Sequence, residues 1–145
     1  MRPYWAAMPA EAPIAERPRA IGIAVVIHAG RVLVGIRGPD GPLPGLAEFP
    51  GGKCEPGETP EACAIRECAE ESGLAVAVEE RLGDVVWEYP HGRVHLHFVL
   101  CRPLQAADVQ PQHHGFRWLL PDQLAAVEFP EANRSVLALV RERLS

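Results

Sequence analysis

Runs of apolar residues, interrupted by glycine and proline, divide the chain into short strands. Residues 20–37 are rich in β-branched side chains and break at Ala29 and Gly30, which predicts two strands joined by a tight turn. Residues 74–89 and 93–104 predict a second pair of strands with a turn near residues 90–92. Residues 38–47 contain three prolines and three glycines and predict a loop, followed by a short extended segment at 48–50 and a glycine-rich turn.

The second half of the chain predicts a loop over 105–115, a short strand over 116–120 and a brief helix over 121–127. Two longer helices are also predicted. Thr59 can cap the first, Pro60 suits its first position, and Gly73 suits a left-handed end, so this helix spans residues 60–72. The second closes the chain over 130–144, with apolar residues at Val136, Leu137, Val140 and Leu144.

Helical geometry sorts the side chains of residues 60–72 into two faces. With Ile65 at the centre, Ala62, Cys68, Ala69 and Ser72 form a small, mostly apolar face that we expect to be buried. Glu67, Glu70 and Glu71 lie on the opposite side, within an arc of about 100°. These carboxylates are either a solvated acidic face or a set of oxygen ligands for Mg²⁺ or Mn²⁺.

Strands mixed with a few helices, without regular β-α alternation, predict an α/β (α+β) sandwich. The 145 residues suit one domain, which we place at residues 20–145, after an Ala- and Pro-rich tail or arm at residues 1–19.

A formal charge of −5 and the lack of a Lys/Arg run argue against binding to duplex nucleic acid. No apolar run approaches the ~20 residues of a membrane span, and the N-terminus does not resemble a signal peptide, so we expect a cytoplasmic protein with reduced cysteines. A zinc site built from Cys63, Cys68, His113 and His114 is a less favoured alternative, because Cys68 falls on the apolar helix face.

Residues 48–74 resemble the signature of the Nudix hydrolase family, G-x5-E-x7-R-E-U-x-E-E-x-G-U, where U is apolar. The matching positions are Gly52, Glu58, Arg66, Glu67, Glu70, Glu71, Gly73 and Leu74. Cys68 departs from the pattern at the first U, where a buried thiol can replace an aliphatic side chain.

This resemblance implies a Nudix fold, a mixed β-sheet between helices, and a phosphoanhydride-cleaving site that uses Mg²⁺ or Mn²⁺. Its implied metal ligands are Glu67, Glu70, Glu71 and the carbonyl of Gly51. Glu58 and Arg66 are implied to orient the helix, and with Glu67 and Glu70 they form the predicted catalytic set.

Residues 20–140 are further similar to the MutT branch of that family, which acts on oxidised nucleoside triphosphates. Arg37 matches an arginine that contacts nucleotide phosphates, and Asn133 an asparagine that binds the purine edge; Lys53 is the third predicted substrate-binding residue. An asparagine at this position could instead cap the last helix. Phe129 or Trp87 could stack on a base, but we expect both to be core residues, and His95 and His97 to be structural or surface residues.

Gln112 stands where MutT-like enzymes carry a glutamate near the metals, and an amide cannot serve as a general base. Glu67, Glu70, His113 and His114 are therefore alternative bases.

The resulting hypothesis is a monomer or homodimer that hydrolyses a small nucleotide, with 8-oxo-dGTP as leading substrate. CTP, 5-methyl-dCTP, ADP-ribose and dinucleoside polyphosphates are alternatives, as is a non-catalytic nucleotide sensor.

Overall fold

The computed structural model describes residues 17–41, 43–90 and 92–144. The strands are β1 (Arg19–His28), β2 (Arg31–Ile36), β3 (Ala47–Glu48), β4 (Gly51–Lys53), β5 (Val76–Tyr89), β6 (Gly92–Pro103), β7 (Gln112–His113) and β8 (Phe116–Leu119). The helices are α1 (Pro60–Ser72), α2 (Pro121–Ala126) and α3 (Arg134–Leu144), with 3₁₀ turns η3 (Ala106–Asp108) and η4 (Glu131–Asn133). Residues 1–16 of the predicted N-terminal tail lie outside the described part of the chain, and β1 already begins at Arg19.

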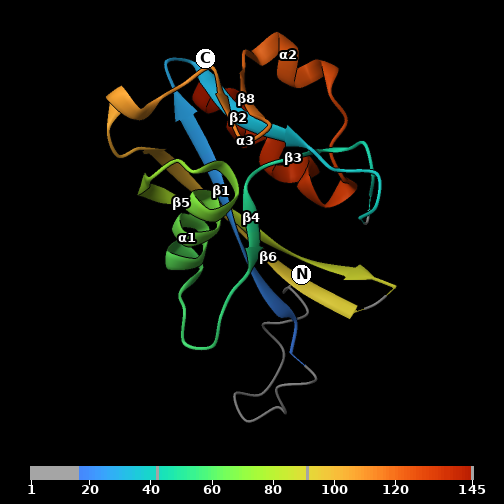
Figure 1. Cartoon of the computed structure of the whole chain (residues 1–145). Helices are drawn as coiled ribbons and strands as arrows, with labels where there is room; N and C mark the ends of the chain where they lie inside the picture. Colours follow the sequence, from blue (N-terminus) through green and yellow to red (C-terminus); the bar gives the residue numbers. More distant parts are fainter. Residues whose placement is uncertain (1–16, 42, 91, 145) are drawn as a thin grey trace.

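The strands form one mixed sheet, in the order β5-β6-β1-β2-β8-β7. β1 and β6 pair in parallel, and the other pairs are antiparallel. β1 pairs with β2 only at Ile27 and His28, near the turn that joins these two strands. Residues 21–23, near the start of β1, pair with β4. β1 and β2 therefore diverge, and β3 and β4 run in the opening between them (Figure 1).

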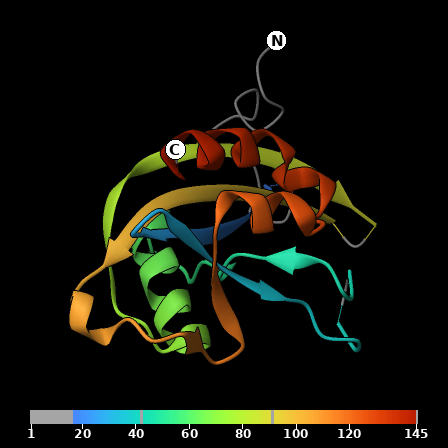
Figure 2. The same cartoon turned by 90° about the horizontal axis from the view of Figure 1, so that it is seen from above.

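Helices cover both faces of the sheet: α1 lies against one face, and α2 and α3 lie against the other (Figure 2). Alternate residues of β1 face the two layers, as expected for a strand buried on both sides. Val25 belongs to the core under α2 and α3, whereas Ala24 and Val26 belong to the core under α1. The predicted mixed sheet between helices is thus confirmed.

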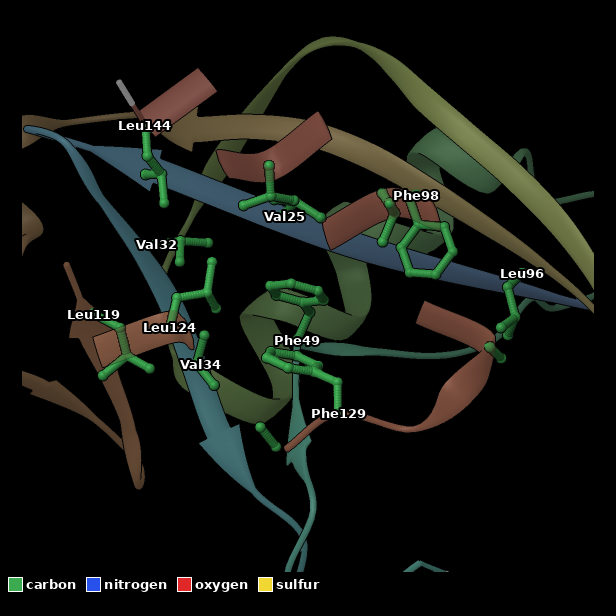
Figure 3. Packing of buried hydrophobic residues seen from close by; sticks show 14 residues of the cluster. Val25, Val32, Val34, Phe49, Leu96, Phe98, Leu119, Leu124, Phe129 and Leu144 are labelled. Carbon is green, nitrogen blue, oxygen red and sulfur yellow. The ribbon is translucent and has the colours of Figure 1, made fainter. Parts of the chain in front are cut away.

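The larger core lies under α2 and α3, where Val136, Val140 and Leu144 form the buried face of α3 (Figure 3). Phe129 packs on Phe49 in this core, with ring centroids 4.8 Å apart. The prediction that Phe129 is a core residue is therefore confirmed.

The two ends of α1 agree with the sequence prediction. The Thr59 hydroxyl accepts a hydrogen bond from the Ala62 N–H at 3.1 Å. Gly73 ends the helix in the left-handed conformation, with φ 74°. Both signals are local, so they could be seen before the packing was known.

The predicted buried face of α1 was right for Cys68 and Ser72 and wrong for Ala62, Ile65 and Ala69, which are exposed. Ile65 is exposed, and the buried residues are Cys63, Ala64, Cys68 and Ser72. The rotation follows from a close approach to β1, since a Cβ atom on Gly22 would lie 2.7 Å from Cβ of Cys63. The glutamates therefore do not all point away from the protein: Glu67 and Glu71 lie at the edge of the buried face.

Four short elements differ from the sequence prediction. The predicted glycine-rich turn after residue 50 is strand β4, the predicted loop over 105–115 contains η3 and β7, and the closing helix begins with η4 before α3. Each of these elements is only two or three residues long, so periodicity does not reveal it.

His95 and His97 were predicted as structural or surface residues, and the four cysteines as reduced thiols. His97 is buried on β6, and the His95 Nε2 lies 2.6 Å from Asp84 Oδ2. Cys68 is fully buried, and all four cysteines are free. Among the described residues, no helix is long and apolar enough to span a membrane.

Candidate functional site

Arg66, in the middle of α1, fastens the helix to the loop that precedes it. Its Nε and Nη2 donate to the two carboxylate oxygens of Glu58, at 2.7 and 2.9 Å. Nη2 also donates to the carbonyl of Lys53 at 3.1 Å, and Nη1 donates to Glu67 at 2.9 Å and Glu70 at 3.2 Å. The hydrogen bond from Arg66 holds the pKa of Glu58 at about 2. One guanidinium thus joins β4, the loop and three carboxylates.

The two glycines of β4 make room for carboxylates of α1. The Gly51 N–H donates to Glu71 Oε1 at 2.7 Å. A Cβ atom on Gly52 would lie 2.5 Å from the carboxylate carbon of Glu67, so any side chain there would displace it. Gly51 and Gly52 therefore form a glycine cradle for the acidic edge of α1, which consists of Glu67, Glu70 and Glu71.

Negative charge gathers where α1 meets β4. Burial, helped by the nearby carboxylates of Glu48 and Glu67, raises the pKa of Glu71 to about 7, against the opposing effects of the Gly51 N–H and Arg37. The Glu67 side chain is largely buried, whereas Glu70 is more than half exposed. A half-buried carboxylate with like charges around it is stabilised when a cation approaches.

The donors at this site suit a hard divalent cation, which prefers carboxylate and carbonyl oxygens. Gly51, Glu67, Glu70 and Glu71, the four predicted ligands, come from β4 and one side of α1. Within the described residues, no three His, Cys, Asp or Glu side chains are already gathered closely enough to hold a metal ion. The reason is visible in the hydrogen bonds: Arg66 holds Glu67 and Glu70, and the Gly51 N–H holds Glu71. Carboxylates must exchange these partners to bind a cation.

A cavity of about 90 Å³, partly open to solvent, adjoins the carboxylates at Gly51. Its lining residues are Ile21, Ile23, Arg37, Glu48, Phe49, Gly51, Tyr89, Leu96, Pro130 and Asn133. Two of the three predicted substrate-binding residues, Arg37 and Asn133, therefore face one space. Lys53 is exposed and does not line this cavity, although its carbonyl binds Arg66.

The polar lining of the cavity includes a residue that sequence reasoning missed. Glu48 Oε1 lies 3.5 Å from Arg37 Nε, and burial raises the pKa of Glu48 although Arg37 opposes the shift. Asn133 is buried at the end of η4, directly before α3. The sequence does place Glu48 between the apolar residues Ala47 and Phe49. In an extended segment, a charged side chain between two apolar ones points away from the face that they occupy.

The loop that holds two of the candidate bases, His113 and His114, does not line this cavity. Gln112 lines a separate groove with Val34, Ile36 and Arg117, among others. His113 is buried, and its Nε2 accepts the Gln110 N–H at 3.1 Å, so this nitrogen already has a proton donor. His114 lies beside Gly73 at the end of α1, where a Cβ atom on the glycine would be 3.1 Å from the imidazole.

Comparisons with known proteins agree on one family. The family model described as NUDIX domain matches residues 22–139. An 8-oxo-dGTP diphosphatase of Escherichia coli (strain K12) is 30% identical, over 84% of this chain and 94% of that protein. A CTP pyrophosphohydrolase of the same organism is 28% identical, over 75% of this chain and 79% of that protein. The crystal structure of the MutT protein from Methanosarcina mazei Go1 has the same fold, with a TM-score of 0.70 and 20% identity over 88% of this chain and 96% of that one.

Proposed function

Because the chain belongs to the Nudix hydrolase family, we propose that it hydrolyses a nucleoside triphosphate to the monophosphate and pyrophosphate, with an oxidised purine nucleotide such as 8-oxo-dGTP as substrate. The observation that carries this proposal is the adjacency of two parts. The acidic edge of α1 meets the cavity at Gly51, so a nucleotide can place its phosphates at one part and its base in the other.

A divalent metal, Mg²⁺ or Mn²⁺, would be held by Glu67, Glu70, Glu71 and the Gly51 carbonyl, and would supply charge neutralisation and an activated water. The glycine cradle and the all-oxygen donor set support this assignment. The chain's own residues contribute position. Arg66 and Glu58 fix the loop against α1, so the carboxylates have a defined place relative to β4.

Arg37 is the cationic residue of the cavity lining. In the proposed complex its guanidinium contacts the phosphates, where it offsets charge as the bond to the leaving group breaks. Catalysis then rests on positioning and electrostatic stabilisation, which dominate phosphoryl chemistry.

The preference for an oxidised purine rests on the chemistry of Asn133. An amide offers one donor and one acceptor side by side. In 8-oxoguanine the N7–H is a donor and the adjacent O6 is an acceptor, so both atoms can pair with the amide. In guanine both atoms are acceptors, and one of them would face the amide oxygen. The apolar walls, which include Ile21, Ile23 and Leu96, suit the faces of a flat base.

A pyrimidine nucleotide is the second candidate, because the CTP pyrophosphohydrolase is nearly as similar in sequence as the 8-oxo-dGTP diphosphatase. Hydrolysis of CTP or 5-methyl-dCTP would use the same acidic edge of α1 and differ only in the base. Comparison of pyrophosphate release from 8-oxo-dGTP with that from CTP and 5-methyl-dCTP separates the two candidates.

The metal assignment is tested with Glu70→Gln, which removes one charge from an exposed position and should leave the fold intact. We expect Mn²⁺ binding, followed by calorimetry, to weaken, and pyrophosphate release to fall by several orders of magnitude. Glu79→Gln is the matched control, since Glu79 is an exposed carboxylate of β5. Near-normal metal binding and turnover in Glu70→Gln would remove Glu70 from the ligand set.

A further inference from the structure

The alternation of side chains along the extended chain sets the direction of the Glu48 side chain. Ala47 and Phe49, its neighbours, are buried in the core under α2 and α3. Since successive side chains of an extended segment point to opposite faces, Glu48 turns away from that core. It lines the cavity together with Arg37 and Asn133, and its side chain is 30% exposed. A half-buried carboxylate thus faces the space that we assign to the nucleotide.

This carboxylate has capacity for further hydrogen bonds. Arg37 is its cationic neighbour, with the Nε atom 3.5 Å from Oε1. An ionised carboxylate offers about four acceptor sites, so one guanidinium leaves most of them available. Phosphates would be repelled by Glu48, because both groups are negative. The group that Glu48 binds must therefore bring N–H or O–H donors into the cavity.

Guanine-type bases present two neighbouring donors, the N1–H and the 2-amino group, which match the two oxygens of one carboxylate. Adenine and cytosine place an acceptor beside their amino group, and uracil or thymine has a single N–H between two carbonyls. We propose that Glu48 is a specificity-determining residue that accepts hydrogen bonds from the N1–H and 2-amino group of a guanine-type base, while Asn133 binds the adjacent edge. This inference rests on the proposed function, because it takes the cavity as the base site.

The test measures binding of nucleoside monophosphates, which requires no hydrolysis. The pair is 8-oxo-dGMP and its hypoxanthine analogue 8-oxo-dIMP, which differ only by the 2-amino group. For the unmodified protein we expect 8-oxo-dGMP to bind about tenfold or more tightly, since a hydrogen bond to a charged acceptor is lost with the amino group. In Glu48→Gln the preference should fall to near unity, because an amide presents one acceptor and turns a donor toward the base. Glu88 is an exposed carboxylate at the end of β5, next to the cavity-lining Tyr89, and the control variant Glu88→Gln should retain the full preference.

Three results would overturn the inference. Equal binding of the two nucleotides by the unmodified protein would mean that Glu48 does not read the 2-amino group. An unchanged preference in Glu48→Gln, with both affinities reduced alike, would show that Glu48 only orients Arg37. Loss of affinity with the 3′-deoxy analogue of 8-oxo-dGMP, but not with 8-oxo-dIMP, would show that Glu48 binds the sugar hydroxyl and not the base.

The outcome is separable from that of the proposed function. A protein that discriminates the 2-amino group but hydrolyses no triphosphate would retain this inference and refute the reaction. A protein that hydrolyses 8-oxo-dGTP without such discrimination would retain the reaction and refute the role of Glu48.

Discussion

The guanidinium of Arg66 binds both carboxylate oxygens of Glu58, with Nε 2.7 Å from Oε2 and Nη2 2.9 Å from Oε1. This two-point contact fixes the loop to the helix in one orientation, which a lysine could not do. The same guanidinium reaches Glu67 and Glu70. The contact therefore links the shape of the loop to the position of the carboxylates that we assign to the metal.

A pH dependence of stability follows from this contact. Arg66 lowers the pKa of Glu58 to about 2, against an ordinary value of 4.5. The folded state therefore favours the ionised carboxylate, and the contact stabilises the protein fully above pH 4.5 and loses its effect as the pH falls toward 2. The difference in free energy of unfolding between the unmodified protein and Glu58→Gln should shrink over that range. Urea unfolding at pH 7, 4 and 3 measures it, and a difference that stays constant with pH would contradict the assignment.

Much of the α1 segment could be read from the sequence because its signals are local. Thr59, Pro60 and Gly73 define the ends of the helix by their own conformational preferences, and the structure places them as predicted. The rotation of α1 could not be predicted, since it depends on the approach of Cys63 to Gly22, 41 positions apart in the sequence. Helical periodicity pointed to the face centred on Ile65, whereas the close approach to Gly22 buries the face that contains Cys63 and Ala64.

The cavity was only partly predictable for a related reason. Arg37 and Asn133 were identified by resemblance to the MutT branch, and both line the cavity. Glu48 and Tyr89 were missed, since β3 is two residues long and the end of β5 reaches the cavity only through the folding of the sheet. Strands this short carry no periodic signal of their own.

The two glycines of β4 should respond differently to alanine. In Gly52→Ala the new Cβ meets the end of the flexible Glu67 side chain, so the protein should fold but bind Mn²⁺ more weakly and turn over at least tenfold more slowly. In Gly51→Ala the Cβ would lie 2.7 Å from the backbone oxygen of Gly22, which should cost about 1–3 kcal/mol of stability. Thermal unfolding and Mn²⁺ calorimetry on both variants separate these effects. Normal Mn²⁺ affinity in Gly52→Ala would mean that Glu67 does not need its present position.

The amide of Asn133 should matter more for purines than for pyrimidines. Asn133→Ala leaves two polar atoms of the base edge unpaired, which costs about 1–3 kcal/mol and should lower kcat/KM for 8-oxo-dGTP accordingly. Hydrolysis of CTP by the same variant should change less. Comparison of kcat/KM for both nucleotides in the variant and the unmodified protein measures the effect. An equal loss for both, together with a lower melting temperature, would indicate that Asn133 only caps α3.

The most direct test of the central claim is a screen of pyrophosphate and phosphate release. The substrates are canonical and oxidised deoxynucleoside triphosphates, CTP, 5-methyl-dCTP, ADP-ribose and diadenosine polyphosphates, each with Mg²⁺, Mn²⁺ or excess EDTA. We predict pyrophosphate release that requires the metal and is fastest with 8-oxo-dGTP. Faster cleavage of a pyrimidine nucleotide would retain the reaction and refute the oxidised-purine substrate. Absence of pyrophosphate release from every triphosphate in the presence of either metal would contradict the proposed function.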